Sequence, residues 1–221
     1  MLYFKKSQPA PACLAKEATK KRGDYKCGDV LERLQKDFKN KCYICEKTPT
    51  TINIEHFKSH QGDKSLKFSW DNLFFACSHC NNTKLAKYDD ILDCTQDVYI
   101  EEKLKYIFHP YPYEKVTIKA LDSQTTTRNT KKLLESVFNG TTKQKKMESA
   151  NIRNKLLLEI QEFQKCLTEY CLNNYDEDYQ NYLLAQIKSH LHQASNFTSF
   201  KRWIIRDNAE LFSQFSCYLK S

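Results

Sequence analysis

The sequence predicts an α+β protein that is mostly helical, with a small strand–strand–helix (ββα) unit held by four cysteines and a helical C-terminal region. Three observations support this fold class. Two C-x-x-C pairs bracket a stretch that contains two short apolar runs of strand character. The second half of the chain repeats apolar residues at helical spacing. Only 4 of the 221 residues are glycine and 5 are proline, which is too few for a loop-rich or all-β protein.

Composition divides the chain into four segments. Residues 1–41 are expected to form a basic N-terminal arm and a helix, and residues 42–92 the cysteine-bracketed unit. Residues 93–126 are an extended connector with a strand, and residues 127–221 are the helical region. The first ~25 residues are polar and basic, and we expect an arm without a core of its own.

The helix that precedes the first cysteine pair is indicated by apolar spacing and by a start signal. Its apolar positions are Val30, Leu31, Leu34 and Phe38. Asp29 is the expected N-cap, and Glu32, three residues later, would complete a capping box. This helix would bring the chain to Cys42.

The later elements are predicted from the same kinds of pattern. Alternation of Val116, Ile118 and Ala120 predicts a strand, and Gly140 is expected to end a short helix that covers 130–138. Three apolar stripes then predict core-facing helices. They comprise Ile152, Leu156, Ile160, Phe163, Leu167 and Tyr170; Leu183, Leu184, Ile187 and Leu191; and Phe200, Trp203, Ile204 and Leu211.

Charge and hydropathy restrict the functional class. The N-terminal segment 1–41 carries eleven basic and five acidic side chains, and residues 128–155 carry eight and two. Two basic segments favour a polyanionic partner, although a solvated basic surface explains net charge equally well. No apolar run approaches the ~20 residues of a membrane span, and the N-terminus lacks a secretory signal. We therefore expect a cytoplasmic protein without a membrane partner, whose ten cysteines are thiols or metal ligands.

The two cysteine pairs predict a zinc site. Cys42 and Cys45 form one C-x-x-C knuckle, Cys77 and Cys80 form the other, and 31 residues separate them. Four thiolates complete the tetrahedron that zinc prefers and leave no open position, so this Zn²⁺ would be structural. The remaining six cysteines show no knuckle spacing and receive no role: Cys13, Cys27, Cys94, Cys166, Cys171 and Cys217.

Between the knuckles, a predicted strand ends in the pair Glu55-His56. A hard cation such as Mg²⁺ or Mn²⁺ prefers oxygen ligands, which Glu55 and Asn81 could supply. A neutral imidazole at His56 could take a proton from an attacking water. Together these groups suit metal-assisted cleavage of a phosphodiester. His60 and Lys84 are candidate phosphate contacts; a solvated loop histidine and a solvated helix lysine are the alternatives. His79, within the second knuckle, is expected to serve packing or to face solvent.

At these residues the sequence resembles the HNH endonuclease family. The matching pattern comprises Cys42-x-x-Cys45, Glu55-His56, Trp70-x-Asn72-Leu73 and Cys77-x-x-Cys80-Asn81-x-x-Lys84. The resemblance implies a ββα-metal nuclease unit in which His56 is the general base, Glu55 and Asn81 bind the catalytic metal, and Asn72 orders the loop beneath the histidine. Glu55 stands where many members have Asp, and Ser59 stands where proline is common.

The whole chain is similar to the PtuB-like HNH nucleases of Septu-type and retron-associated anti-phage systems. This resemblance is carried by "LYFKKSQPAP", by "FHPY" and by "FNGTTKQKKMESANIRNKLLLEI". It implies a DNA-cleaving (or RNA-cleaving) subunit that works beside an ATPase of the ABC/SMC type. Two alternatives are a zinc-stabilised nucleic-acid-binding adaptor that does not cut, and a stand-alone restriction or homing endonuclease.

Overall fold

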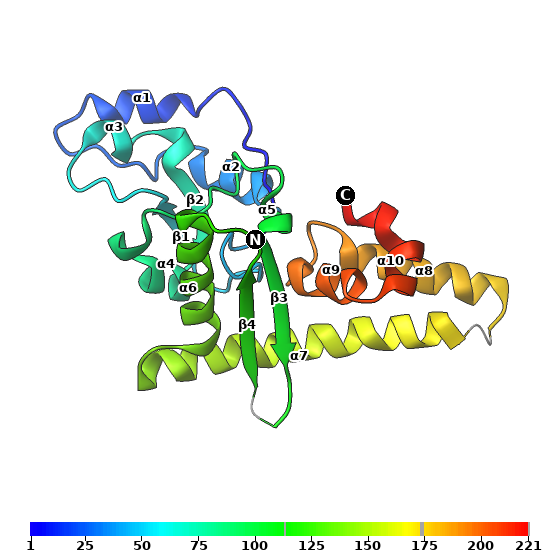
Figure 1. Cartoon of the computed structure of the whole chain (residues 1–221). Coiled ribbons are helices and arrows are strands. Elements are labelled where there is room, and N and C mark those ends of the chain that lie inside the picture. The colour runs from blue at the N-terminus through cyan, green and yellow to red at the C-terminus, as the bar shows by residue number, and fades with distance from the viewer. Residues whose placement is uncertain (113, 173–174, 221) are drawn as a thin grey trace.

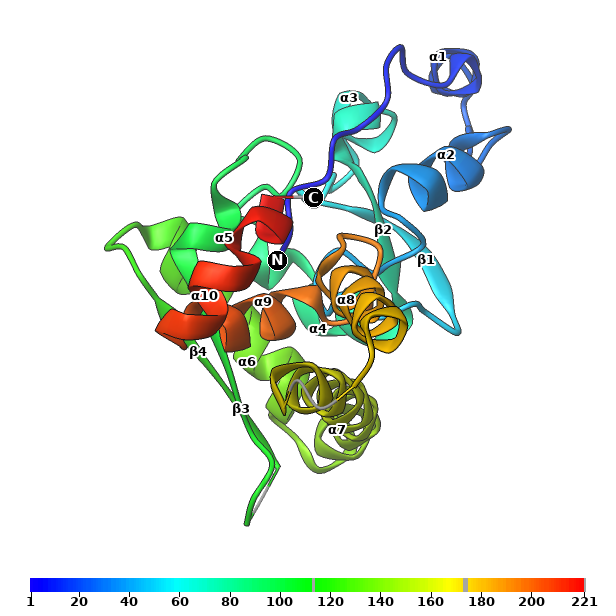
Figure 2. The same cartoon turned by 90° about the vertical axis from the view of Figure 1, so that its right-hand side faces the viewer.

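The computed structural model describes residues 1–112, 114–172 and 175–220 and confirms an α+β fold that is mostly helical (Figures 1 and 2). Two separate antiparallel hairpins supply the strands. Residues 173–174 and 221 of the predicted helical region lie outside the described part. The helices and strands are, in chain order, α1 (Ala12–Ala18), α2 (Val30–Asp37), β1 (Ile52–His56), α3 (Lys64–Lys67), β2 (Leu73–Cys77), α4 (Ser78–Lys84), α5 (Ile100–Lys103), β3 (Leu104–His109), β4 (Lys115–Ala120), α6 (Thr125–Asn139), α7 (Lys143–Leu172), α8 (Glu177–Leu191), α9 (Thr198–Arg206) and α10 (Ala209–Phe215).

The first hairpin and the helix that follows it occupy the cysteine-bracketed segment. Strand β1 pairs with β2 in antiparallel register, with Ile54 opposite Phe75 and His56 opposite Leu73. All five residues of β2 are buried, because the strand is a run of apolar residues that is covered on both of its faces. Helix α4 begins at the residue after β2 ends, so β2 leads directly into α4, whereas α3 lies in the connection between β1 and β2.

The first residues of the chain, expected to form an arm without a core of its own, pack into the main core. Met1, Leu2 and Phe4 are completely buried and belong to the main hydrophobic cluster. The backbone N–H of Phe4 donates to the carbonyl of Cys94 (2.7 Å). These apolar side chains therefore contribute to the core of the cysteine-bracketed unit.

A disulfide corrects a second expectation, that the cysteines are unpaired. Cys13 in α1 is bonded to Cys27, with their Cα atoms 6.0 Å apart. Gly28 has a left-handed backbone (φ 49°), and a Cβ there would lie 3.1 Å from the Cys13 sulfur, so the chain passes very close to the bridge. The bond closes residues 13–27 into a loop, named the N-terminal loop below.

Helix α2 confirms the predicted element but not its capping box. The helix begins at Val30, and Asp29 occupies the N-cap position. Asp29 contributes its backbone carbonyl, which accepts from the N–H of Arg33 (3.0 Å). The capping role assigned to its carboxylate was wrong, because its backbone is not extended (φ −88°, ψ 9°) as capping requires.

The helical region follows the predicted stripes. Helix α6 begins at Thr125 and ends at Asn139, and Gly140 follows with φ 71°. A Cβ at Gly140 would lie 2.4 Å from the backbone nitrogen of Lys146, so only glycine allows the tight turn into α7. Helix α7 then places Ile152 and Leu156 in the main cluster and Phe163 and Leu167 in a second cluster with α8 to α10.

The C-terminal helices pack directly on the first cysteine pair. The side chain of Lys41, fully buried, donates to the carbonyls of Gln193 and Ser195 in the loop between α8 and α9. The N–H of Phe197 donates to the carbonyl of Glu46 (3.1 Å). The loop between α8 and α9 is therefore tied to the two residues that flank the first cysteine pair, Lys41 and Glu46.

Candidate metal centre and catalytic site

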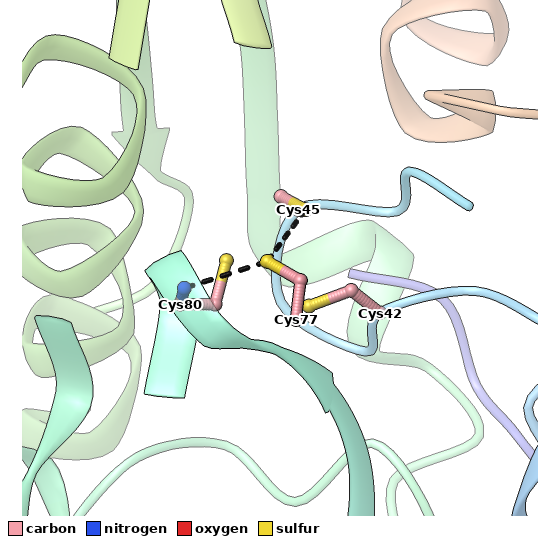
Figure 3. Close-up of side chains that lie close together, drawn as sticks. All are labelled: Cys42, Cys45, Cys77 and Cys80. Atoms are coloured by element: carbon pink, nitrogen blue, oxygen red, sulfur yellow. Dashed lines mark hydrogen bonds between the residues drawn. The ribbon is translucent and has the colours of Figure 1, made fainter. Parts of the chain in front are cut away.

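The structure brings the four predicted cysteines together in one buried cluster (Figure 3). The sulfurs of Cys42, Cys45, Cys77 and Cys80 all lie within 4.8 Å of one another, and all four residues are buried. A tetrahedral zinc–thiolate site places its sulfurs about 3.8 Å apart, because each Zn–S bond is about 2.3 Å long. The cluster could therefore hold a metal ion such as zinc.

Local backbone geometry explains how the two knuckles meet. The N–H of Cys42 donates to the carbonyl of Lys47 (3.0 Å), which closes the first knuckle into a tight turn, and Glu46 in this turn has a left-handed backbone (φ 61°). Cys77 is the last residue of β2 and the N-cap of α4, where its sulfur accepts from the N–H of Cys80 (3.4 Å). The first turn of α4 thus presents both sulfurs of the second knuckle.

His56 lies at the end of β1 with one ring nitrogen fixed. Its Nε2 is 3.0 Å from the carbonyl oxygen of Lys67. A carbonyl can only accept, so Nε2 carries the hydrogen and the lone pair of the neutral ring is on Nδ1. Burial lowers the pKa of His56 below its ordinary value, and the nearby positive charges of Lys67 and Lys84 act in the same direction. The imidazole is therefore neutral near pH 7 and can accept a proton at Nδ1.

Asn72 holds the loop that leads from His56 to α3. Its amide nitrogen donates to the carbonyls of Lys58 (2.9 Å) and Leu66 (3.0 Å), and its amide oxygen accepts from the N–H of Lys58 (2.7 Å). Both functional atoms of the side chain are used, so only an amide fits this position. Asn72 fixes both ends of the loop and, with it, the Lys67 carbonyl that orients His56.

Glu55 points to the side of β1 that faces α4. Its Oε1 lies 3.2 Å from the ammonium of Lys84, which is itself almost completely buried. Burial raises the pKa of Glu55 to about 7, although Lys84 opposes this shift. The other carboxylate oxygen, Oε2, is buried, and no hydrogen bond from the described residues reaches it. Glu55, the predicted metal ligand, is therefore paired with Lys84, a cation of the protein itself.

Lys84 is thus neither a solvated helix lysine nor positioned at the surface to contact phosphate. Its ammonium also lies 3.4 Å from Asp89 and 3.4 Å from the carbonyl of His56. It joins α4 to the end of β1, so its present role is to hold Glu55 and the backbone of His56. Asn81 is three residues before Lys84 and therefore lies on the same side of α4.

His60 is brought next to His56. The two imidazole rings are 4.7 Å apart in an edge-on arrangement. Nδ1 of His60 accepts from the N–H of Gly62 (3.1 Å), so Nε2 carries the hydrogen in the neutral ring. His60 is half-buried and could donate to an oxygen near His56.

Three residues of the site were missed in the sequence. The ring of Tyr25 lies 4.5 Å from that of His56, edge-on, and Asp89 accepts from the N–H of Ser59 (3.0 Å) while facing Lys84. Lys67 contributes its carbonyl. Asp89 lies beyond the end of α4 and Tyr25 comes from the distant N-terminal loop, so neither had a signal in the sequence.

His79 corrects another expectation, since it neither faces solvent nor serves only packing. Its Nδ1 lies 2.7 Å from the carboxylate of Glu148 in α7, and its Nε2 lies 2.9 Å from the carbonyl of Val137 in α6. It therefore connects α4, between the two cysteines of the second knuckle, with the first turns of α7.

No family model and no curated protein sequence matches the chain. Within the described residues, no helix has both the length and the apolar character that a membrane crossing requires.

Proposed function

We propose that the chain is a metal-dependent endonuclease of the HNH type that cleaves phosphodiester bonds of nucleic acid, most readily DNA. One observation carries the proposal. At the end of β1, in the segment of the sequence between the two cysteine pairs, His56 has Nε2 bonded to a backbone carbonyl and keeps the lone pair on Nδ1. A fixed neutral imidazole of this kind is what general-base activation of water needs.

In this mechanism His56 takes a proton at Nδ1 from the attacking water. The Lys67 carbonyl keeps the ring in the correct tautomer and stabilises the imidazolium that forms. Asn72 prevents the loop from moving, and His60 could donate a hydrogen bond to a phosphate oxygen. The four cysteines, closed and buried, would hold a structural zinc that takes no part in the reaction.

A Mg²⁺ or Mn²⁺ ion, when bound, would supply charge stabilisation at the phosphate and the leaving oxygen. The donor set fits a hard cation, because Glu55 and Asn81 offer a carboxylate and an amide oxygen. The buried Oε2 of Glu55, which no described group reaches by a hydrogen bond, supports this fit.

We infer from the sequence resemblance to PtuB-like nucleases that the proposed activity serves anti-phage defence and is restrained by a partner ATPase of the ABC/SMC type. A stand-alone restriction or homing enzyme would keep the same chemistry without the partner. Two observations distinguish these alternatives: whether the isolated chain cleaves nucleic acid, and whether added ATPase changes the rate of cleavage.

A second candidate function is a nucleic-acid-binding adaptor that does not cut. The ion pair between Lys84 and Glu55 favours it, because the ammonium already neutralises the carboxylate that a catalytic metal would need. The basic segments would then account for binding without cleavage.

The experiment that tests the proposal incubates supercoiled plasmid, and separately a labelled RNA, with purified protein and Mg²⁺ or Mn²⁺. The variants are wild type, His56→Ala and the matched control His109→Ala, since His109 is an exposed histidine on β3. We expect cutting by wild type and the control, and a loss of at least ~100-fold with His56→Ala. Equal cutting by His56→Ala would refute the assignment of the base. Tight binding without cutting by any variant would favour the adaptor.

A further inference from the structure

The N-terminal loop, residues 13–27, lies against the candidate catalytic histidine although it is far from it in sequence. Its carbonyls at Lys20 and Gly23 accept from the ammonium groups of Lys64 (3.1 Å) and Lys67 (2.9 Å), both in α3. Figures 1 and 2 show α1 and the following loop next to α3 and beyond the β1–β2 hairpin. The loop is therefore anchored on the element that orients His56.

Two groups from different parts of the chain contact the His56 ring. Tyr25 of the N-terminal loop approaches it at 4.5 Å, with 66° between the ring planes, and His60 approaches at 4.7 Å, with 65°. Tyr25 is half-buried, so it is partly accessible to solvent. Anything that reaches His56 from this side meets the N-terminal loop first.

The N-terminal loop is strongly basic. It has five basic and two acidic side chains, and the neighbouring segment 56–67 has three and one. Lys20 is paired with Glu17, but Lys21, Arg22 and Lys26 are exposed. The amine of Lys26 also lies 5.8 Å from the centre of the Tyr25 ring. Exposed cations therefore belong to the same loop as Tyr25, the residue that contacts the imidazole of His56.

The disulfide restricts this basic loop. Cys13 and Cys27 join its two ends, so the exposed cations belong to a closed loop that is also tied to α3 at two carbonyls. A closed and anchored loop loses less conformational entropy when it binds a ligand than a free arm would. Such preorganisation is expected of a binding element, in addition to the stability that a disulfide gives to the folded chain.

We propose that the N-terminal loop is the part of the protein that holds the phosphodiester backbone of the nucleic acid beside His56. In this arrangement Lys21, Arg22 and Lys26 contact phosphates that flank the one to be cleaved, and Tyr25 fixes the edge of the imidazole. The disulfide keeps these groups in register with the site. This inference rests on the proposed function, because it assigns the substrate-binding surface of that same site.

The test measures binding of a 20-base-pair DNA duplex at several salt concentrations. It uses the full chain with His56→Ala, so that no cleavage interferes. One variant adds Lys21→Gln, Arg22→Gln and Lys26→Gln. A matched control instead adds Lys115→Gln, Lys119→Gln and Lys165→Gln, which removes three exposed cations from β4 and α7. The β3–β4 hairpin projects away from α1 and α3 in both views.

Each phosphate contact contributes about 0.9 to the slope of log affinity against log salt on duplex DNA. We expect the loop variant to lose about 0.9 of slope for every contact removed, and the control to keep the parent slope. An unchanged slope in the loop variant overturns the proposal. An equal loss in both variants also overturns it, because charge anywhere on the surface would then be sufficient.

Two further measurements complete the test. Cys13→Ser with Cys27→Ser should weaken duplex binding several-fold while the zinc content stays at the level of the parent. Unchanged affinity would show that the disulfide plays no part in binding.

Plasmid cleavage with intact His56 distinguishes the endonuclease hypothesis from the assignment of the N-terminal loop. If the protein binds through the loop but never cuts, the loop assignment stands and the endonuclease fails. If it cuts, and the loop variant cuts and binds like wild type, the endonuclease stands and the loop assignment fails.

Discussion

The ammonium of Lys84 lies 3.2 Å from the carboxylate of Glu55, and both side chains are almost completely buried. Their attraction crosses from α4 to β1, so this pair connects the helix of the strand–strand–helix unit with the strand that carries His56. Breaking one half of a buried pair leaves an uncompensated charge, whereas replacing both halves does not.

The ion pair can be tested by a double-mutant cycle. We expect Lys84→Met to lower the free energy of unfolding by about 3 kcal/mol, because the buried Glu55 then lacks its cationic partner, whether it stays charged or binds a proton. Lys84→Met combined with Glu55→Gln should recover most of this loss. Urea unfolding of the four proteins measures the coupling. Strictly additive effects would show that the two groups do not stabilise each other.

Removal of the cysteine ligands should affect folding and not only activity. Cys77→Ser is expected to abolish zinc binding and cooperative unfolding, because the metal would join segments that are distant in sequence. Cys171→Ser, at an exposed free cysteine, is the control and should retain one zinc ion per chain. A folded Cys77→Ser protein without metal would contradict a structural zinc.

Asn72→Asp keeps the shape of the side chain but replaces its amide donor by an oxygen. The carbonyls of Lys58 and Leu66 would then face an acceptor, which we expect to cost about 2 kcal/mol and to release the loop beneath His56. Cleavage should fall with the zinc content unchanged. Asn82→Asp, on the exposed side of α4, controls for the added charge and should have little effect.

A pH dependence of stability is expected from His190, which is distant in sequence from the metal ligands. Burial and the ammonium of Lys201, 3.1 Å away, lower the pKa of His190 below 6.5, although Glu159 and Glu162 oppose this. Below pH 6.5, His190 binds a proton in the unfolded chain, whereas in the folded protein it stays neutral until a lower pH. Stability is therefore complete above pH 6.5 and is lost as the pH falls through the folded pKa.

The measurement compares wild type with His190→Asn by thermal unfolding between pH 8 and pH 5. The variant lacks this titration, so the difference in stability between the two proteins should change in favour of the variant as the pH falls. If the cysteine cluster holds a metal ion, its loss at acidic pH would affect both proteins equally and cancel in the difference. A constant difference over this range would rule out His190 as the source.

Local patterns were sufficient for much of the fold. The alternation around Ile54, the apolar run of β2 and the stripe on α7 are periodic features, and each led to the correct element. The cysteine cluster was also predictable, because C-x-x-C spacing reflects the tight turn that a metal requires. These features depend on residues that are close together in the chain.

The features that could not be predicted depend on long-range contacts. The position of Tyr25 beside His56 depends on the Cys13–Cys27 bond and on two carbonyls held by α3, none of which has a sequence signal. Lys84 looks like a solvated helix lysine until the strand that faces it is known. In the same way, the burial of Met1 follows from packing by segments more than a hundred residues away.

Helix α7 has a consequence for the cooperativity of unfolding. Its 30 residues contribute Ile152 and Leu156 to the main cluster and Phe163 and Leu167 to the cluster of the C-terminal helices. Neither cluster can lose its side chains without breaking this one helix, whose propagation is itself cooperative. The cysteine-bracketed unit and the C-terminal helices therefore form a single thermodynamic unit, and a calorimetric scan of the intact chain should show one transition.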